Sequence, residues 1–513
     1  MQFSTILISE EFVHKSVDVD STGSTVHHQP SMSSAFRLIA AGGILQTIGE
    51  TFALGASGAI AAGSAALIFC SAAASVTLLC AGLRAHPAKE KTAAQAHPRL
   101  SIARLARLKR LVSGGLLTLL MLAALWTIAT SGTLLIQHPL DPTGYDSDAA
   151  AFIHYQAEDV LRGINPYTDT AGFWEAVQQF PNAGATPLQR GQFTQDALSP
   201  SDATISALLQ RYAQDPSHAG SEFDPASLHS YPAGSFLLAV PFIWAGFSST
   251  QPLYALCLLL LFALLIRWAP QGWRWRVALL LISLSIPITL TLRSSFEVVC
   301  ILCVVAAWRA QARHPLVAAM LLGVGCSVKQ LTWLFLPFYL IWMLRQRGWR
   351  AAALAGTICL LVFFAINAPF LLAAPNAWAS SMLLPVTEPA FPGGIGLITL
   401  AQGSVTPLLP TWVYTALEAA SYLGLLGWFS ARQGKTKDGA ALSRAGAWGL
   451  ALAPLPLLLG SRSLISYTMF LPVLALAALL QQSLYQEVTL SDAKSLSTLA
   501  SAGSRPGATS SNE

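Results

Sequence analysis

A polar interval between two long apolar segments contains the residues best suited to chemistry. Asp146 and Asp148 follow shortly after an apolar segment at 111–136. A carboxylate in this place could act as a general base that takes the proton from an attacking hydroxyl group. The alternative is that both carboxylates are only solvated, or that Asp148 caps a helix that begins at Ala149. Carboxylates at the mouth of an apolar bundle would suit a reaction between a lipid and a polar molecule.

Three cations border apolar segments farther along the chain, namely Arg293, Lys329 and Arg462. Ionisable residues in or beside membrane spans are costly, which makes them functional candidates. They could bind a phosphate leaving group, whose negative charge develops in the transition state. The alternative is that their long side chains only reach for the membrane surface.

Other polar and aromatic residues could contact a substrate. Glu388 could bind a sugar hydroxyl or be merely solvated, and His154 could donate a hydrogen bond. Tyr167 and Tyr231 could stack on sugar faces, although aromatic belts at membrane interfaces also explain them. Neither His154 nor His229 has a histidine partner at helical spacing. We therefore expect neither a tightly bound metal ion nor another cofactor.

The composition is that of a polytopic membrane protein. Of 513 residues, 53% are hydrophobic and only 11% are charged, whereas soluble proteins carry about 25% charged residues. The net charge of +5 comes without a Lys/Arg stripe interleaved with aromatic residues, so we expect no nucleic-acid partner. The seven cysteines all lie in apolar segments, and Cys300 and Cys303 are best explained as small packing residues.

Basic clusters set the predicted topology. The strongly basic stretch 84–110 is expected in the cytoplasm. The segment 111–136 then runs outward, so 137–230 forms a large extracytoplasmic loop. Residues 1–35 and 483–513 read as disordered tails, 36–110 as an N-terminal membrane extension, and 111–482 as the main transmembrane body. The further apolar segments are 231–248, 250–268, 276–292, 296–309, 314–328, 331–345, 350–374, 411–431, 443–460 and 464–482.

Two segments are predicted not to cross the bilayer. If every apolar segment spanned the membrane, the basic clusters could not all lie on the cytoplasmic side. Residues 231–248 carry Pro232 and Pro241 and suit a half-inserted helix, while 393–409 suits a re-entrant segment.

The beginning of the polar loop reads as an amphipathic helix. Residues 149–161 place Phe152, Tyr155, Val160 and Leu161 on a rough apolar face. This pattern predicts a helix that lies on the membrane surface. The glycine at 163 and the Asn-Pro pair that follows it are expected to end the helix.

These motifs resemble a known family of enzymes. The residues that carry the resemblance are Asp148, Phe152, Tyr155, Leu161-Arg162-Gly163-Ile164-Asn165-Pro166-Tyr167, Ser230-Tyr231-Pro232 and Ser327-Val328-Lys329-Gln330. They resemble the polyprenol-phosphate-sugar-dependent glycosyltransferases of the C-type (GT-C) superfamily, above all bacterial α-mannosyltransferases, over about 111–482. One departure is Arg293-Ser294-Ser295-Phe296-Glu297, where relatives carry a Gly-Gln/Asn-x-Asn element.

The resemblance implies an all-α GT-C-like bundle of about 11–13 transmembrane helices in a cell membrane. It implies that a mannose-like hexose moves from a polyprenyl phosphate to a hydroxyl of a glycolipid, lipid-linked glycan or protein, usually with inversion, on the extracytoplasmic face. Asp148 would be the base, with Asp146 as the alternative. Tyr155 and Asn165 would contact the substrate.

Two other classes of protein remain open from the sequence. A transporter or flippase for a lipid-linked saccharide would place paired ionisable groups near mid-membrane, whereas the charges of this chain lie at the rim of the predicted bundle. A scaffold protein without catalysis would tolerate the loss of Asp148.

Overall fold

The computed structural model describes fifteen separate stretches of the chain, two of them within residues 36–45 and the others covering most of residues 102–482. They are 36–37, 39–45, 102–137, 145, 147–169, 172–183, 186, 188–189, 193–196, 199–214, 230–293, 295–387, 390–402, 406–434 and 446–482. The predicted tails, the apolar stretch 57–83 and most of the basic stretch 84–110 lie outside the described residues. So do Asp146, His229 and Glu388.

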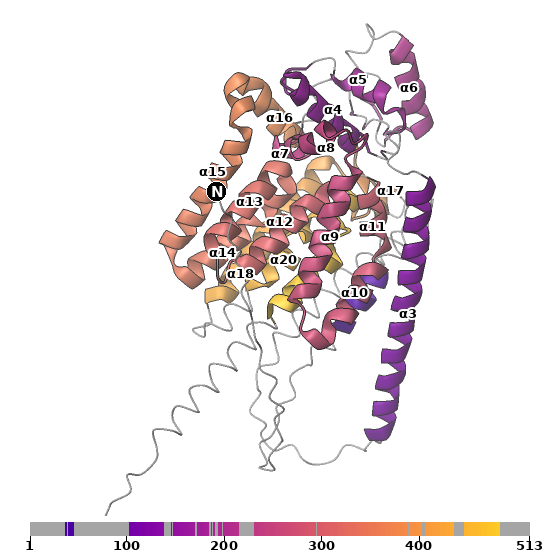
Figure 1. Ribbon diagram of the computed structural model, residues 1–513, viewed down its shortest axis with the longest axis vertical. Helices are drawn as coiled ribbons and strands as arrows, with labels where there is room; N and C mark the ends of the chain where they lie inside the picture. Colours follow the sequence, from indigo (N-terminus) through magenta and orange to yellow (C-terminus); the bar gives the residue numbers. More distant parts are fainter. Residues whose placement is uncertain are drawn as a thin grey trace, which may run out of the picture.

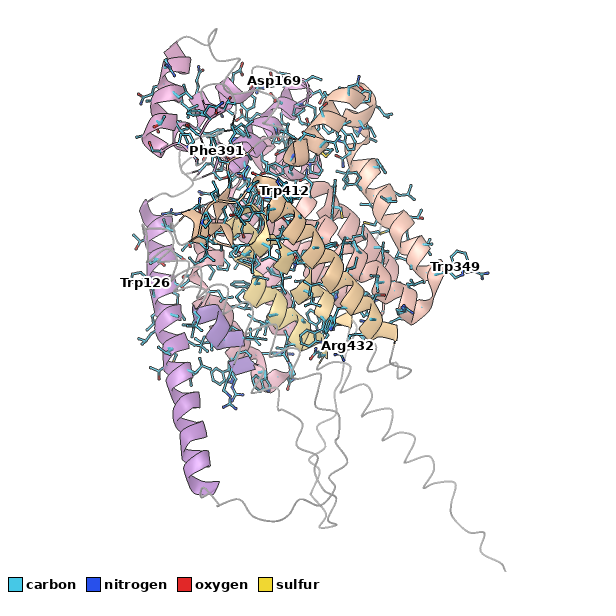
Figure 2. All side chains as sticks on the ribbon, turned by 180° about the vertical axis from the view of Figure 1, so that it is seen from behind. Trp126, Asp169, Trp349, Phe391, Trp412 and Arg432 are labelled. Atoms are coloured by element: carbon cyan, nitrogen blue, oxygen red, sulfur yellow. The ribbon has the colours of Figure 1, made fainter. Side chains whose placement is uncertain are left out.

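A long helix, α3 (Ile102–Gln137), runs along one flank of a helical bundle (Figure 1). It begins earlier than predicted, because no Gly or Pro interrupts the good helix formers before residue 111. It packs on α10 (Arg274–Ser283) and α11 (Ser285–Leu292). Leu122, Leu125 and Trp126 are exposed on α3, and Figure 2 shows Trp126 on this helix. Apolar surface of this kind suits contact with lipid.

The centre of the bundle is built from helices whose apolar residues face one another. The bundle helices are α9 (Gln251–Trp268), α12 (Glu297–Ala310), α13 (Pro315–Val328), α14 (Leu336–Arg347), α15 (Trp349–Ala373), α18 (Thr411–Gly434) and Ile465–Gln482. Helix α13 packs between α12 and α15. Trp308, Phe335 and Phe338 are completely buried in this core. The predicted all-α polytopic membrane fold is confirmed.

Fewer helices are long enough to span a bilayer than the 11–13 expected. Within the described part of the chain, four helices qualify by length and composition, or up to five if a bent pair counts as one span. The pair is α10 and α11, which meet at 60° where a single span was predicted. Helices α12 and α13 have 14 residues each. At 1.5 Å per residue this is about 21 Å, short of the roughly 30 Å hydrocarbon core.

The polar loop folds over one end of the bundle, here called the loop end (Figure 1). The described part of the loop contains α4 (Asp148–Arg162), α5 (Gly172–Gln179), the 3-10 turn η2 (Pro181–Ala183) and α6 (Asp202–Gln214). Asp169 lies at this end and Arg432 at the opposite end (Figure 2). Arg347 also lies away from the loop, since it donates to the carbonyl of Ala312 (2.8 Å) beyond the far end of α12. Arg347 and Arg432 thus lie at the end of the bundle opposite the loop, where the predicted topology places them.

The two segments predicted not to cross the membrane contain only short helices and a short strand within their described residues. Residues 231–248 form α7 (Gly234–Leu237) and α8 (Val240–Trp244), which both pack on α4. Residues 393–409 include β1 (Gly393–Gly394) and α17 (Ile398–Gln402). Strand β1 pairs in parallel with β2 (Arg462–Ser463), which follows the 3-10 helix η8 (Leu455–Leu459). Gly394 has φ +125°, a backbone conformation that favours glycine.

The remaining helices complete the bundle. Helix α16 (Pro375–Thr387) packs on α15 at the loop end, and no apolar span was predicted there. The 3-10 helix η7 (Gln330–Leu334) joins α13 to α14, so the predicted segment 331–345 is divided. Segment 443–460 contains α20 (Trp448–Leu452) and η8 rather than one helix. Helix α21 (Ile465–Thr468) opens the last span.

A close backbone approach between α7 and α13 provides a stability test. A Cβ at Gly234 would lie 2.5 Å from the carbonyl oxygen of Ser327. We expect Gly234→Ala to lower the unfolding free energy by about 1–3 kcal/mol, because the backbones must separate. The measurement is thermal unfolding in detergent. The control is Gly424→Ala on α18, where a Cβ meets nothing within 4 Å; equal stability of the two variants would contradict the packing.

Candidate active site

Helix α4 presents the predicted carboxylate at its first residue. It begins at Asp148 after Ser147 and ends at Gly163, which has φ 78° and ψ 14°. The N–H of Ile164 donates to the carbonyl of Asp159 (2.8 Å) and that of Gly163 to Val160 (3.1 Å). This is the bonding of a Schellman cap. The helix and its glycine end were therefore predicted correctly.

The apolar residues of α4, which were predicted to face a membrane surface, are covered by protein instead. Ile153 and Ala157 belong to the main core of the bundle, whereas Phe152 and Tyr155 belong to a second core with Phe180. Helix α4 is thus covered on both faces, by the bundle on one side and by the rest of the loop on the other. Leu161, predicted on the apolar face, is 42% exposed. An apolar stripe indicates that one face of a helix is covered, but it does not show whether protein or lipid covers it.

The side chain of Asp148 is half-buried and fixed by two backbone donors. Its Oδ1 accepts the N–H of Ala149 (2.7 Å) and its Oδ2 the N–H of Thr186 (2.6 Å). Both carboxylate oxygens keep a further lone pair that can accept a proton or a hydrogen bond. A negative side chain in the first turn also favours the helix. The geometry fits a base and equally fits a residue that starts the helix.

Three of the sequence motifs meet at Tyr231. The hydroxyl of Tyr167 donates to the carbonyl of Tyr231 (2.9 Å), and the amide of Gln330 to the neighbouring carbonyl of Ser230 (2.6 Å). Burial raises the pKa of the Tyr231 hydroxyl to about 12; Lys329 opposes this shift, and nearby Asp148 adds to it. The loop carboxylate and the bundle lysine are thus both within electrostatic reach of one residue.

Lys329 is buried and already paired. It follows the last residue of α13, and its Nζ lies 2.5 Å from Oε1 of Glu297, the first residue of α12. The rings of Tyr231, Phe296 and Tyr467 surround the ammonium at 4.3–5.1 Å. A buried charge needs such compensation, since desolvation of an unpaired charge is very costly.

The other two predicted cations border this place from different segments. Arg462, in β2, is half-buried and forms neither a hydrogen bond nor an ion pair with another described residue. It lies five positions before Tyr467 in the chain. Arg293 caps the end of α11, and its N–H donates to the carbonyl of Thr289 (2.9 Å). Arg293 precedes the turn that leads into Glu297.

His154 lies in a buried chain of hydrogen bonds rather than in an open site. Its Nε2 faces Glu158 (3.1 Å) and its Nδ1 faces the hydroxyl of Tyr145 (2.7 Å). That hydroxyl also accepts the N–H of Thr250 (2.9 Å), the residue before α9. Glu158 accepts a further bond from Gln179 (2.9 Å). The chain fastens α4 to the bundle and to α5.

Tyr155 and Asn165 also have local structural bonds. The hydroxyl of Tyr155 donates to Glu175 on α5, and the guanidinium of Arg162 lies 4.9 Å from the centre of its ring. Asn165 accepts the N–H of Tyr167 (3.1 Å) with its side-chain oxygen. This Asx turn fixes the backbone of Tyr167, whose hydroxyl donates to the carbonyl of Tyr231.

Sequence reasoning gave no role to several residues of this region. Tyr145, Glu175 and Tyr467 were not singled out, because each has its effect through a partner distant in the chain. Glu297 entered only as the last residue of the stretch 293–297 that departs from the family pattern. Glu297 and Lys329 are 32 residues apart, and no local pattern shows that they form a pair. The two side chains meet only because α12 packs on α13.

One comparison with known proteins gave a match. The chain is an α-helical membrane protein, and residues 229–397 match the model of glycosyltransferase family 87. The matched part includes Tyr231, Glu297 and Lys329 but not Asp148 or Arg462. Comparisons with curated proteins and with solved structures gave no match. The fold and the match together support a membrane glycosyltransferase.

The hydrogen-bond chain through Tyr145 can be tested by removing one hydroxyl. Tyr145→Phe leaves Nδ1 of His154 and the N–H of Thr250 without their partner. We expect the unfolding free energy to fall by about 1–3 kcal/mol, because buried polar groups lose their bonds. Thermal unfolding in detergent measures this. Tyr414→Phe is the matched control, because among the described residues that hydroxyl accepts a single long bond of 3.4 Å. An equal loss there would refute the role of the chain.

Asp159 makes the stability of the loop pH-dependent. Its side chain is fully buried; one oxygen accepts from Arg162 (2.8 Å) and the other meets no donor among the described residues. Burial raises its pKa to about 7, and the neighbouring Asp169 adds to the shift. The pKa in the unfolded chain is about 3.9. The folded state therefore binds the proton more tightly, so this contribution to stability decreases as the pH rises from about 4 to 7.

The matching experiment uses Asp159→Asn, which cannot ionise. We expect hydrogen exchange of the α4 amides in the wild type to become several-fold faster between about pH 5 and pH 8, after correction for intrinsic rates. The variant should lose most of this change. Asp196→Asn, at an exposed loop position, should behave as the wild type. A variant with the same pH dependence as the wild type would assign the effect to another group.

Proposed function

We propose that the protein transfers a mannose-like hexose from a polyprenyl phosphate to a hydroxyl group of a glycolipid, a lipid-linked glycan or a protein. The observation that carries the proposal is the junction at Tyr231, whose ring lies 5.1 Å from Nζ of the buried Lys329 and whose carbonyl accepts the hydroxyl of Tyr167 from the loop that carries Asp148. The match of residues 229–397 to a glycosyltransferase family supports it. No cofactor enters the proposed reaction.

Asp148 is the proposed base. Its carboxylate accepts the proton of the acceptor hydroxyl while the hydroxyl oxygen attacks the anomeric carbon of the donor. The bond between that carbon and the phosphate oxygen breaks, and the phosphate leaves with the electron pair. A single displacement inverts the anomeric centre. The two backbone bonds to Asp148 fix the direction of the carboxylate, which lowers the entropy cost of the attack. Asp146 is the alternative base.

The proposed phosphate site consists of the cations at the loop end. Arg462 has its guanidinium uncommitted among the described residues, and a guanidinium can bind two phosphate oxygens at once. Lys329 reaches a phosphate only if Tyr231 or Tyr467 moves, because these rings enclose it. Arg293 is the third proposed contact. Positive charge at these positions stabilises the leaving group in the transition state.

The sugar and acceptor are proposed to bind between Asp148 and this phosphate site. Tyr167, Tyr231 and Glu388 are the proposed contacts. His154, Tyr155 and Asn165 are proposed to act indirectly, since their polar atoms are used in bonds that hold α4 and Tyr167. The polyprenyl chain would lie against apolar helix surfaces in the bilayer. The loop end is proposed to be extracytoplasmic, because the arginine-rich end belongs inside.

A transporter of lipid-linked saccharides is the second candidate. The buried pair of Lys329 and Glu297 is the kind of paired ionisable group that such a protein uses. The pair lies where α12 begins and α13 ends, beside the loop rather than halfway along the helices. This position favours the enzyme, whose proposed base belongs to that loop.

The first test is sugar transfer by the purified chain in detergent or liposomes. Polyprenyl phosphates carrying different sugars serve as donors and membrane extracts as acceptors. We expect Asp148→Asn to lower kcat by about 10²–10⁴-fold, the usual contribution of a general base. Asp196→Asn is the control and should keep full activity.

The comparison of two variants decides the base. If Asp146→Asn is inactive and Asp148→Asn is active, the role belongs to Asp146. Full activity in both variants would disprove catalysis by a loop carboxylate. If the wild type transports a lipid-linked sugar across liposomes and transfers none, the second candidate function replaces the first.

A further inference from the structure

We propose that Glu297 is a positioning residue, which keeps Lys329 charged at the place where that charge acts on the phosphate of the polyprenyl donor. The inference rests on the proposed function, because the phosphate is that of the proposed donor. Glu297 does not touch the substrate in this scheme. It acts through Lys329.

The first observation is that both oxygens of the Glu297 carboxylate accept hydrogen bonds. Its Oε1 accepts from Nζ of Lys329 and its Oε2 from the hydroxyl of Ser295, both at 2.5 Å. The side chains of Glu297 and Lys329 are only 4% and 6% exposed. The Ser295 bond fixes the carboxylate, so Lys329 receives a counter-charge at a defined point.

The second observation is the surroundings of the ammonium. The ring centres of Phe296, Tyr467 and Tyr231 lie 4.3, 4.9 and 5.1 Å from Nζ. Aromatic faces attract a cation, but they carry no negative charge that balances it. The titratable groups that face Lys329 are Glu297 and Cys300 from α12, Tyr231 before α7, and Tyr467 from α21. At neutral pH Glu297 is the anion among them.

The third observation is where the enclosure can open. Tyr231 lies within electrostatic reach of Asp148, and Tyr467 follows the strand that carries Arg462. A phosphate bound by Arg462 would therefore border the tyrosine side of the enclosure. An ammonium has three N–H donors, and Glu297 uses one of them. Displacement of a tyrosine ring would offer the others to phosphate oxygens without breaking the pair.

Loss of Glu297 would have a specific consequence. A buried ammonium without a counter-charge is unfavourable, and burial shifts such a lysine towards its neutral form. In Glu297→Gln, Lys329 should therefore lose its charge as the pH rises. Glu297→Asp keeps the negative charge and should preserve much of the function. A residue that only packs would produce no such dependence on pH.

The experiment measures binding of sugar-free polyprenyl phosphate to the purified full chain by tryptophan fluorescence. It is done at about pH 7 and about pH 9, both above the second ionisation of a phosphate monoester near 6. We expect Glu297→Gln to bind at least about tenfold more weakly at the higher pH than at the lower. Lys329→Gln should be equally weak at both, and the double variant should resemble it. Wild type and Glu297→Asp should bind at both.

Two further measurements separate positioning from folding. Glu418→Gln removes another partly buried carboxylate of the bundle and should bind as the wild type. Melting temperatures identify any variant that is merely unfolded, and the double variant lacks the unpaired charge that would destabilise either single one. In sugar transfer, Glu297→Gln should raise KM for the donor more than it lowers kcat.

The inference and the proposed function can fail separately. Wild-type binding in the double variant would reduce the pair to a structural contact, and pH-independent binding in Glu297→Gln would also overturn the inference. A wild type that binds no polyprenyl phosphate would overturn it even if sugar is transferred. If binding depends on Glu297 as expected but no sugar is transferred from any donor, the inference stands and the transferase does not.

Discussion

The loop end depends on one physical constraint, which is that a charge removed from water must be compensated where it lies. Lys329 is buried at the end of α13, so Glu297 must stand opposite it at the start of α12. This requirement fixes how the two helices meet. The aromatic rings that complete the enclosure come from before α7 and from α21. Four segments far apart in the sequence are thereby held at one point. The carbonyl of Tyr231 connects this point to the polar loop, because it accepts the hydroxyl of Tyr167.

The loop is fastened to the bundle by polar bonds around an apolar centre. Helix α4 contributes small and apolar residues to both cores, while the chain from Glu158 through His154 and Tyr145 reaches the start of α9. Each buried polar atom in this chain has a partner, which is the condition under which a buried network stabilises a unique arrangement. A carboxylate at the first residue of α4 is consequently held at a constant place relative to Tyr231. This is what a base needs if the other substrate is anchored in the membrane.

Local patterns in the sequence predicted local structure well and distant contacts poorly. The helix at 149–161 followed from its periodicity and Gly163, and most bundle helices followed from apolar runs. The break between α10 and α11 and the division of segment 331–345 into η7 and α14 did not, because they depend on packing and on hydrogen bonds beyond each segment. The motifs around Asp148, Tyr167, Tyr231 and Lys329 were identified separately. That Tyr231 joins them, and that Glu297 balances Lys329, required the tertiary arrangement.

The same arrangement relates the ion pair to the distribution of charge over the molecule. Arg347 and Arg432 lie at the far end, away from the loop, whereas Lys329 and Arg462 lie near the loop in two different environments. Lys329 has its charge balanced, whereas Arg462 has no partner among the described residues. In the proposed scheme a phosphate could bind Arg462 without displacing a carboxylate of the described residues. Lys329 keeps its counter-charge whether or not the phosphate is bound, so its buried ammonium is never left without a partner.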